Sequence, residues 1–453
     1  MAVAGVPTEL GTEKVSKLLK QYAVPAIIAM TASSLYNMVD SIFIGHGVGK
    51  FAIAGLALTF PLMNLGAAFG ALVGVGASAT ISMLLGQKNY EMAQKVLGNV
   101  ITLNTIIGIV YSIVFLLFLD PILYFFGASE NTIGYARDYM TIILLGNIVT
   151  HMYLGLNAIM RSAGLPKKAM YLTIFTVIIN AILDPLFIYV FKWGIQGAAI
   201  ATVVSQTMAL ALTVKTFSNK NLVIHFKKGI YKLKSRIIKD ILSIGMGPFF
   251  MNSAACLIVI LINQGLQQHG GDLAIGAYGI VNRFSFIFVM IVLGLNQGMQ
   301  PIVGFNYGAR QYKRVVETLK LTIICATAVT TLGFILAEFF PRAISMVFTT
   351  DEELIKHSVR GLRIVFACFP IIGFQIVAGN FFQSVGMAVK SVFMSLTRQL
   401  IFLLPLLLLL PRFIQTDGIW ISMPIADGLS SLIAFILLYT QIKKFKNHKE
   451  YGN

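Results

Sequence analysis

The sequence predicts an all-α polytopic membrane protein, and two properties carry this prediction. Hydrophobic residues make up 57% of the 453 residues and charged residues only 12%, which is about half the charged share of a soluble domain. The apolar residues also gather into about twelve runs, each long enough to cross a hydrocarbon core of about 30 Å as a helix. The runs lie near residues 20–45, 52–80, 94–119, 134–158, 168–191, 196–218, 238–263, 274–303, 316–340, 358–382, 388–411 and 418–442.

The net charge of +17 indicates topology rather than binding to nucleic acid. When the loops are assigned alternately to the two sides, most Lys and Arg residues fall on the side that holds both termini. The positive-inside rule makes that side cytoplasmic, so we expect a multi-pass protein of a bacterial cell (inner) membrane with both termini inside. The opposite side holds Lys50, Arg137, Lys192, Arg342, Lys356, Arg360, Arg363 and Arg412.

The chain repeats itself after about 222 residues. Short sequence matches support the repeat, among them Gly86-Gln87-Lys88 with Gly308-Ala309-Arg310, and Ser162-Ala163-Gly164 with Ser384-Val385-Gly386. Six spans in each half give both halves the same orientation, with a pseudo-twofold axis along the membrane normal. We therefore expect two six-helix bundles, residues 1–218 and 238–453, joined by a basic cytoplasmic loop over 219–237.

Two carboxylates inside the apolar runs are candidates for function. Asp40 lies in the first run, and Asp184 lies in the fifth with Asn180 one helical turn before it. An acid within a membrane helix costs several kcal/mol unless it faces a protein interior or water. Both acids lie within roughly 10 Å of the same membrane boundary at 1.5 Å per residue, so they can share one cavity. The alternative is that each is structural, bonded to neighbours or reaching outward.

Other chemistry is not favoured. Cys256, Cys325 and Cys368 lie far apart in apolar runs with no CxxC, and no histidine has metal-ligand spacing with a second His or Cys. The stretch from Gly45 to Lys50 does not satisfy the phosphate-loop pattern. We therefore expect neither an enzyme nor a bound cofactor.

The sequence resembles a known family, the multidrug and toxic compound extrusion (MATE) transporters, and within it most closely the MepA-like branch. The resemblance covers nearly the whole chain, and it implies the MATE/MOP-type fold with twelve transmembrane helices. The stretches that carry it are residues 37–45, Arg161-Ser162-Ala163-Gly164, residues 180–185, residues 197–202 and residues 296–309.

The resemblance also implies a coupling site in the first half. Family members similar in this half use the matching acids, with nearby asparagines and a threonine, to bind H⁺ or Na⁺. The resemblance assigns this role to Asp40, Asn180, Asp184, Thr202 and Asn157, with a possible Na⁺ at the first four. Two neighbouring carboxyl groups release their protons in separate steps, and hard oxygen ligands also suit Na⁺. The sequence leaves the choice of ion open.

The second half carries a further acid, Asp427, in the last run beside Pro424. Arg283 and Arg398 are the arginines inside runs, and either is expected to neutralise it. A structural ion pair is the first reading, and a role in substrate binding or gating is the second. The expected cavity residues are Tyr36, Asn37, Gln297, Gln300, Arg283, Arg398 and Asp427.

These expectations combine into one function. We expect an exporter of lipophilic, often cationic, small-molecule drugs or toxic metabolites, working as a monomer by H⁺ or Na⁺ antiport with alternating access. The nearest alternative is a lipid-linked oligosaccharide flippase of the same superfamily, which a cationic central cavity and a lateral lipid groove would favour.

Overall fold

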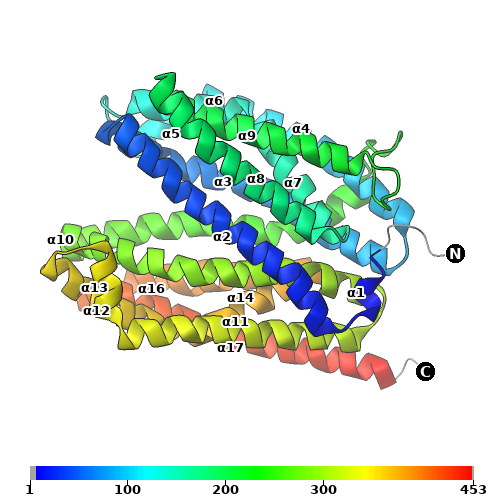
Figure 1. Ribbon diagram of the computed structural model, residues 1–453. Helices are drawn as coiled ribbons and strands as arrows, with labels where there is room; N and C mark the ends of the chain where they lie inside the picture. Colours follow the sequence, from blue (N-terminus) through cyan, green and yellow to red (C-terminus); the bar gives the residue numbers. More distant parts are fainter. Residues whose placement is uncertain (1–6, 451–453) are drawn as a thin grey trace. The chain divides into compact units, whose positions relative to one another are not determined.

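The computed structural model describes residues 7–450, except for the side chains of Asn37, Met38, Ile42, Gly45, Lys50, Asp272 and residues 448–450. Helices account for 88% of the described residues, and this part of the chain contains no strand. In chain order the helices of the first half are α1 (Glu9–Thr12), α2 (Val15–Gly47), α3 (Lys50–Gly86), α4 (Tyr90–Leu117), α5 (Leu119–Phe125), α6 (Ile133–Leu145), α7 (Asn147–Ser162), α8 (Pro166–Pro185), the π-helix η1 (Leu186–Val190) and α9 (Gly194–Phe217) (Figure 1).

The second half continues in the same way. It contains α10 (Ser235–Gly308), α11 (Tyr312–Phe339), α12 (Pro341–Phe348), α13 (Glu352–Phe366), α14 (Phe369–Ser384), α15 (Ala388–Leu396), the π-helix η2 (Thr397–Leu403), α16 (Leu404–Leu409) and α17 (Pro411–Glu450).

The expected twelve spans are confirmed. Within the described residues, 10 helices are long and apolar enough to cross a membrane, and two bent helix pairs bring the number to 12. The bent pairs are α6 with α7, at 55°, and α13 with α14, at 52°. They correspond to the fourth and tenth expected spans, which are equivalent in the repeat. The long ribbon α10 holds two spans that meet at Gly271, where the backbone is not helical (φ 63°, ψ −161°).

The backbone itself repeats. Three pairs of residues separated by the repeat length have positive φ, which is the conformation that ends a helix and favours glycine. The pairs are Gly49 with Gly271, Lys88 with Arg310, and Gly164 with Gly386, with φ values from 58° to 114°. Two chain segments with different side chains therefore turn at the same points, as the sequence repeat predicts.

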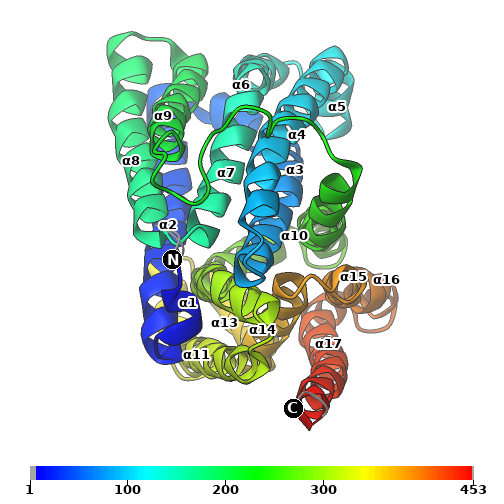
Figure 2. The same cartoon turned by 90° about the vertical axis from the view of Figure 1, so that its right-hand side faces the viewer.

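The first of two compact units comprises Ile28–Phe249 with the residues up to Leu10. Its apolar core includes Ile44, Leu62, Tyr139, Ile188 and Ile195. Helix α7 contacts α3, α4, α8 and α9, and Figure 2 shows it between α8 and α9 on one side and α3 and α4 on the other.

Glycines bring α3 and the start of α10 very close together in this unit. A Cβ on Gly245 would lie 1.8 Å from the carbonyl oxygen of Leu72, and one on Gly76 would lie 2.0 Å from that of Ile241. Small residues at such crossings let backbones pack closely in a membrane. This packing places the beginning of α10 in the first unit, so the unit extends to Phe249 rather than to the predicted loop at 219–237.

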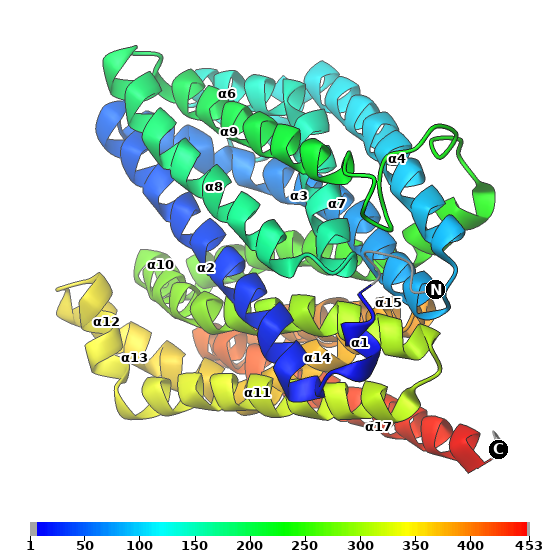
Figure 3. The same ribbon diagram turned by 45° about the vertical axis from the view of Figure 1, so that its right-hand side comes forward.

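The second unit comprises Gly11–Ile27 and Phe250–Asn453. Its core contains Leu266, Phe288, Phe366, Phe369 and Trp420, and α14 packs against both α11 and α17 (Figure 3). The first residues of α2 belong here because Gly294 and Gly298 of α10 allow the backbone at Ile27 and Ala23 to approach. The rest of α2, from Ile28 onward, belongs to the first unit.

Candidate functional site

Two acids from different helices meet inside the first unit. Asp40 lies near the end of α2, and Asp184 is the last residue before Pro185 at the end of α8. The two side chains belong to residues that are 6% and 0% exposed, and their carboxyl groups lie within hydrogen-bonding reach of each other. The structure thus brings together the two carboxylates that the sequence singled out.

Asn180 supports the pair from one turn earlier on α8. Its side-chain Nδ2 donates to Asp184 Oδ1 at 3.2 Å, as expected for residues at i and i+4. Three buried oxygens remain without a hydrogen-bond partner among the described residues, namely Asp40 Oδ1, Asp184 Oδ2 and Asn180 Oδ1. A buried acceptor without a donor is costly. The arrangement therefore favours whatever supplies one positive charge here, either a proton shared by the carboxyl groups or a cation.

A threonine and two tyrosines form the wall beside the acids. The hydroxyls of Thr202 (α9) and Tyr36 (α2) lie 3.1 Å apart, and Tyr139 (α6) lies beside Thr202. Thr202 donates its own proton to the carbonyl of Ala198 at 3.1 Å. A hydroxyl has one proton and two lone pairs, so Thr202 is left to accept from Tyr36.

Sequence reasoning missed Tyr139. It is only 2% exposed and interacts electrostatically with both Asp40 and Asp184. The chain has 16 tyrosines, and the sequence spacing of Tyr139 from Asp40 or Asp184 does not distinguish it from the others as a site residue. Only the bend between α6 and α7 and the packing of α6 on α9 bring it to the site.

Asn157 does not reach the acid pair. Its Nδ2 donates to the carbonyl of Ala169 at 3.1 Å, and its Oδ1 accepts from Arg161 at 2.6 Å. Ala169 lies about 15 residues before Asp184 on α8, which is about 22 Å along the helix. The structure thus does not bring Asn157 to the acids as expected, because the tight turn at 163–165 holds this part of α7 beside the beginning of α8.

The remaining first-half candidate, Asn37, has a side chain outside those described. Gln297 and Gln300 lie on α10 in the second unit, where Gln300 is buried. Their neighbour Asn296 is 2% exposed, and neither polar atom of its side chain has a hydrogen-bond partner within the described part of the chain. It is a further buried polar residue of that unit.

The second unit contains a buried ion pair of its own. Arg398 Nε donates to Asp427 Oδ1 at 2.5 Å, and Arg398 lies on η2, where the helix is locally widened. The side chain of Asp427 is 1% exposed and that of Arg398 is 30% exposed. Arg283 is exposed. Of the two arginines that the sequence offered, the packing selects Arg398 as the partner.

Among the residues that the structure describes, no group of three or more His, Cys, Asp or Glu side chains is placed to hold a metal ion.

Comparison with known proteins places the chain in a family. The MatE family model matches twice, over residues 25–186 and 248–409, which together make up well over half of the chain. The multidrug export protein MepA of Staphylococcus haemolyticus (strain JCSC1435) is 26% identical over 424 residues, covering 94% of this chain and 93% of that protein. MepA of Staphylococcus aureus (strain NCTC 8325 / PS 47) is 26% identical over 432 residues, covering 94% of each.

Solved structures agree. The MATE multidrug transporter DinF-BH is 38% identical, with a TM-score of 0.88 over 95% of this chain and 96% of that chain. An outward-facing MATE family transporter of the MOP superfamily shares the fold at 22% identity, with a TM-score of 0.91 over 97% and 98% of the two chains. The protein is thus a multi-pass membrane protein of the MatE family, the MATE multidrug efflux transporters.

Proposed function

We propose that this protein exports lipophilic, often cationic, compounds in exchange for an ion that binds between Asp40 and Asp184. The observation that carries the proposal is the contact between these carboxyl groups beside three buried oxygens that have no donor among the described residues. A proton or a cation binds to such a pair at low free-energy cost, because it supplies the positive charge that the buried oxygens lack. A cationic substrate and a coupling ion would then compete for the same negative charge.

The competition supplies a mechanism for exchange. A ligand drives a conformational cycle only through its different affinities for the two states. An ion entering from outside neutralises the pair and releases the substrate. Loss of that ion to the cytoplasm restores the negative charge that attracts the next cation. We further propose that both termini are cytoplasmic and that the working form is a monomer.

The hydrogen bonds around Thr202 support H⁺ rather than Na⁺ as the coupling ion. A Na⁺ site here would need the Thr202 oxygen as a ligand, but that hydroxyl is already hydrogen-bonded to Tyr36 and to the carbonyl of Ala198. A proton between the carboxyl groups needs no further ligand. An acidic site also suits cationic drugs, whereas the flippase alternative calls for a cationic cavity.

The test is efflux of ethidium, a lipophilic cation, from a bacterium that lacks its own pumps. Asp40→Asn and Asp184→Asn are compared with wild type at equal expression, each energised by a proton gradient and separately by a Na⁺ gradient. Asp138→Asn, which removes an exposed acid on α6, is the matched control.

We expect wild type and Asp138→Asn to export under the proton gradient, and both pair variants to lose at least about tenfold in initial rate, or roughly 1.4 kcal/mol. Export driven only by Na⁺ would overturn the choice of ion. If both pair variants export as well as wild type, the acids are structural. If wild type does not move the dye, the exporter itself is contradicted.

A further inference from the structure

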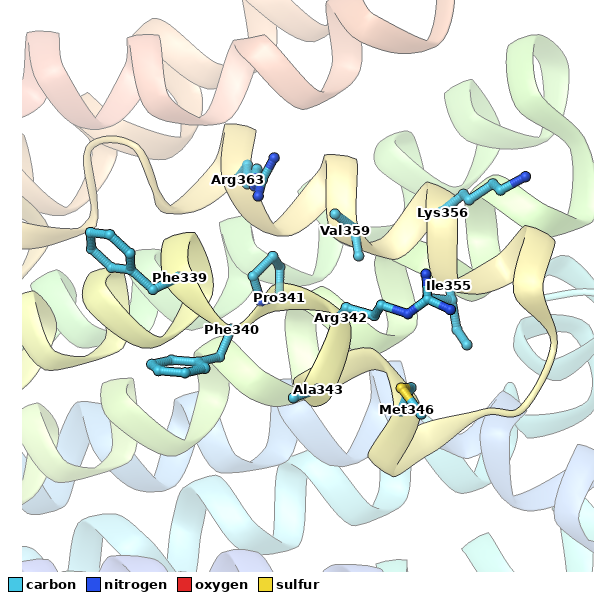
Figure 4. A pocket seen from close by; sticks show the side chains of 10 residues that line it. All are labelled: Phe339, Phe340, Pro341, Arg342, Ala343, Met346, Ile355, Lys356, Val359 and Arg363. Atoms are coloured by element: carbon cyan, nitrogen blue, oxygen red, sulfur yellow. The ribbon is translucent and has the colours of Figure 1, made fainter.

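A pocket of about 670 Å³ lies in the second unit, and none of its lining residues belongs to the acid pair or to the Arg398–Asp427 ion pair. It is formed where the span α11 ends at Phe339 and the chain turns into the short helices α12 and α13 (Figure 4). A pocket at the end of a membrane span lies at the depth where lipid headgroups meet acyl chains. Its position therefore exposes it to the lipid interface.

One part of the pocket is apolar and exposed. Phe339 and Phe340 lie at one end of it and Met346 toward the other (Figure 4), with exposures of 73%, 57% and 56%. Val347, next in sequence, is 80% exposed. Large exposed side chains on a short amphipathic helix are typical of segments that lie in the membrane interface with their apolar face toward the acyl chains.

The polar part of the pocket is cationic. Lys356, Val359 and Arg363 line it from α13, and their spacing of three and four residues places them on one face of that helix. The third cation, Arg342 of α12, lies between the two helices (Figure 4) and pairs with Glu352 at 2.8 Å. None of the described residues that line the pocket is acidic.

Lys356 and Arg363 have no acidic partner among the described residues, in contrast to the neighbouring Arg360, which pairs with Asp417 at 2.5 Å. Lys356 and Arg363 lie about 10 Å apart along one helix face of a pocket that exposed apolar side chains also line. Together these groups complement one kind of molecule. That molecule has an anionic oxygen-rich head and hydrocarbon tails.

We propose that this pocket binds a phospholipid with an anionic headgroup. Its anionic headgroup lies along the helix face that carries Lys356 and Arg363, and its acyl chains follow Phe339, Phe340 and Met346. Guanidinium and ammonium groups bind phosphate oxygens through charge-assisted hydrogen bonds, and their aliphatic stems lie comfortably along hydrocarbon. Lipid binding at this site does not depend on the proposed exchange mechanism, since it is measured without transport.

The experiment measures equilibrium binding of phosphatidylglycerol and phosphatidylcholine to the delipidated full-length protein in detergent, by native mass spectrometry. The test variant is Lys356→Gln/Arg363→Gln. The matched control is Lys192→Gln/Arg412→Gln, which removes two exposed cations that lie outside the pocket. Lys356→Arg/Arg363→Lys keeps both charges.

We expect wild type to prefer phosphatidylglycerol and the test variant to bind it roughly 25-fold more weakly, because each interfacial cation contributes roughly a fivefold factor. The control and the charge-conserving variant should bind as wild type, and all variants should keep the melting temperature of wild type. The proposal fails if wild type binds the two lipids equally or if the test variant retains full affinity. It also fails if millimolar inorganic phosphate displaces the lipid, because the pocket would then hold a soluble anion.

Discussion

Arg398 Nε and Asp427 Oδ1 lie 2.5 Å apart, and the other oxygen of Asp427 is buried without a hydrogen-bond partner in the described part of the protein. The arginine thus neutralises the charge of Asp427 but donates a hydrogen bond to only one of its two carboxylate oxygens. Arg398 keeps part of its side chain accessible while Asp427 is enclosed. This asymmetry makes a structural role and a functional role separable by experiment.

For this ion pair we expect Arg398→Leu alone to destabilise the protein by about 3–5 kcal/mol, because it leaves a buried carboxylate unpaired. Arg398→Leu/Asp427→Leu should recover most of that stability. Thermal unfolding of the purified variants in detergent measures both effects. Dye efflux of the double variant then decides the role, since a structural pair predicts recovered export and a gating or substrate-binding pair predicts a stable protein that does not export.

At the acid pair, Asn180→Ala should slow dye efflux about tenfold at equal expression. The change removes the donor to Asp184 Oδ1, and a hydrogen bond to a charged group contributes about 1.5–3 kcal/mol. Thr176→Ala, one turn earlier on the same helix, is the control and should export as wild type. Wild-type efflux by Asn180→Ala would mean that this hydrogen bond has no part in coupling.

Thr202→Ala should lower the stability of the protein by about 1–3 kcal/mol, because the half-buried hydroxyl of Tyr36 loses its acceptor. Thr202→Ser keeps the hydroxyl and should unfold near the wild-type temperature. Adding Tyr36→Phe to Thr202→Ala should lower the stability little further, since the effects of substitutions at two residues in direct contact do not add. Equal melting temperatures for Thr202→Ala and Thr202→Ser would show that the hydroxyl cluster contributes nothing.

The close crossing of α3 and α10 predicts a packing defect. Gly245→Ala would place a methyl group 1.8 Å from the carbonyl oxygen of Leu72, and overpacking of this kind costs about 1–3 kcal/mol or more. We expect reduced yield of folded protein and a lower melting temperature. Gly134→Ala, whose added Cβ meets nothing within 4 Å, should be neutral or slightly stabilising. Similar behaviour of the two variants would contradict the described crossing.

The number of spans, the repeat and the candidate acids could all be predicted from local properties of the chain. Hydrophobic length is one such property, so the twelve runs predicted the spans without knowledge of their neighbours. The cost of an acid in hydrocarbon is also local, and it singled out Asp40, Asp184 and Asp427. A positive φ restricts the residue type at a single position. Turn residues such as Gly164 and Gly386 therefore recur at the repeat distance in the sequence itself.

Which side chains meet depends on tertiary packing instead. Hydropathy does not specify how a helix is rotated or which helix lies beside it, because packing against neighbours sets both. For this reason sequence reasoning missed Tyr139 and left Arg283 and Arg398 as equal partners for Asp427, and the family resemblance included Asn157 in the site. The bend of 55° between α6 and α7 and the packing of α6 on α9 placed Tyr139 beside Thr202, and these contacts join residues distant in the chain.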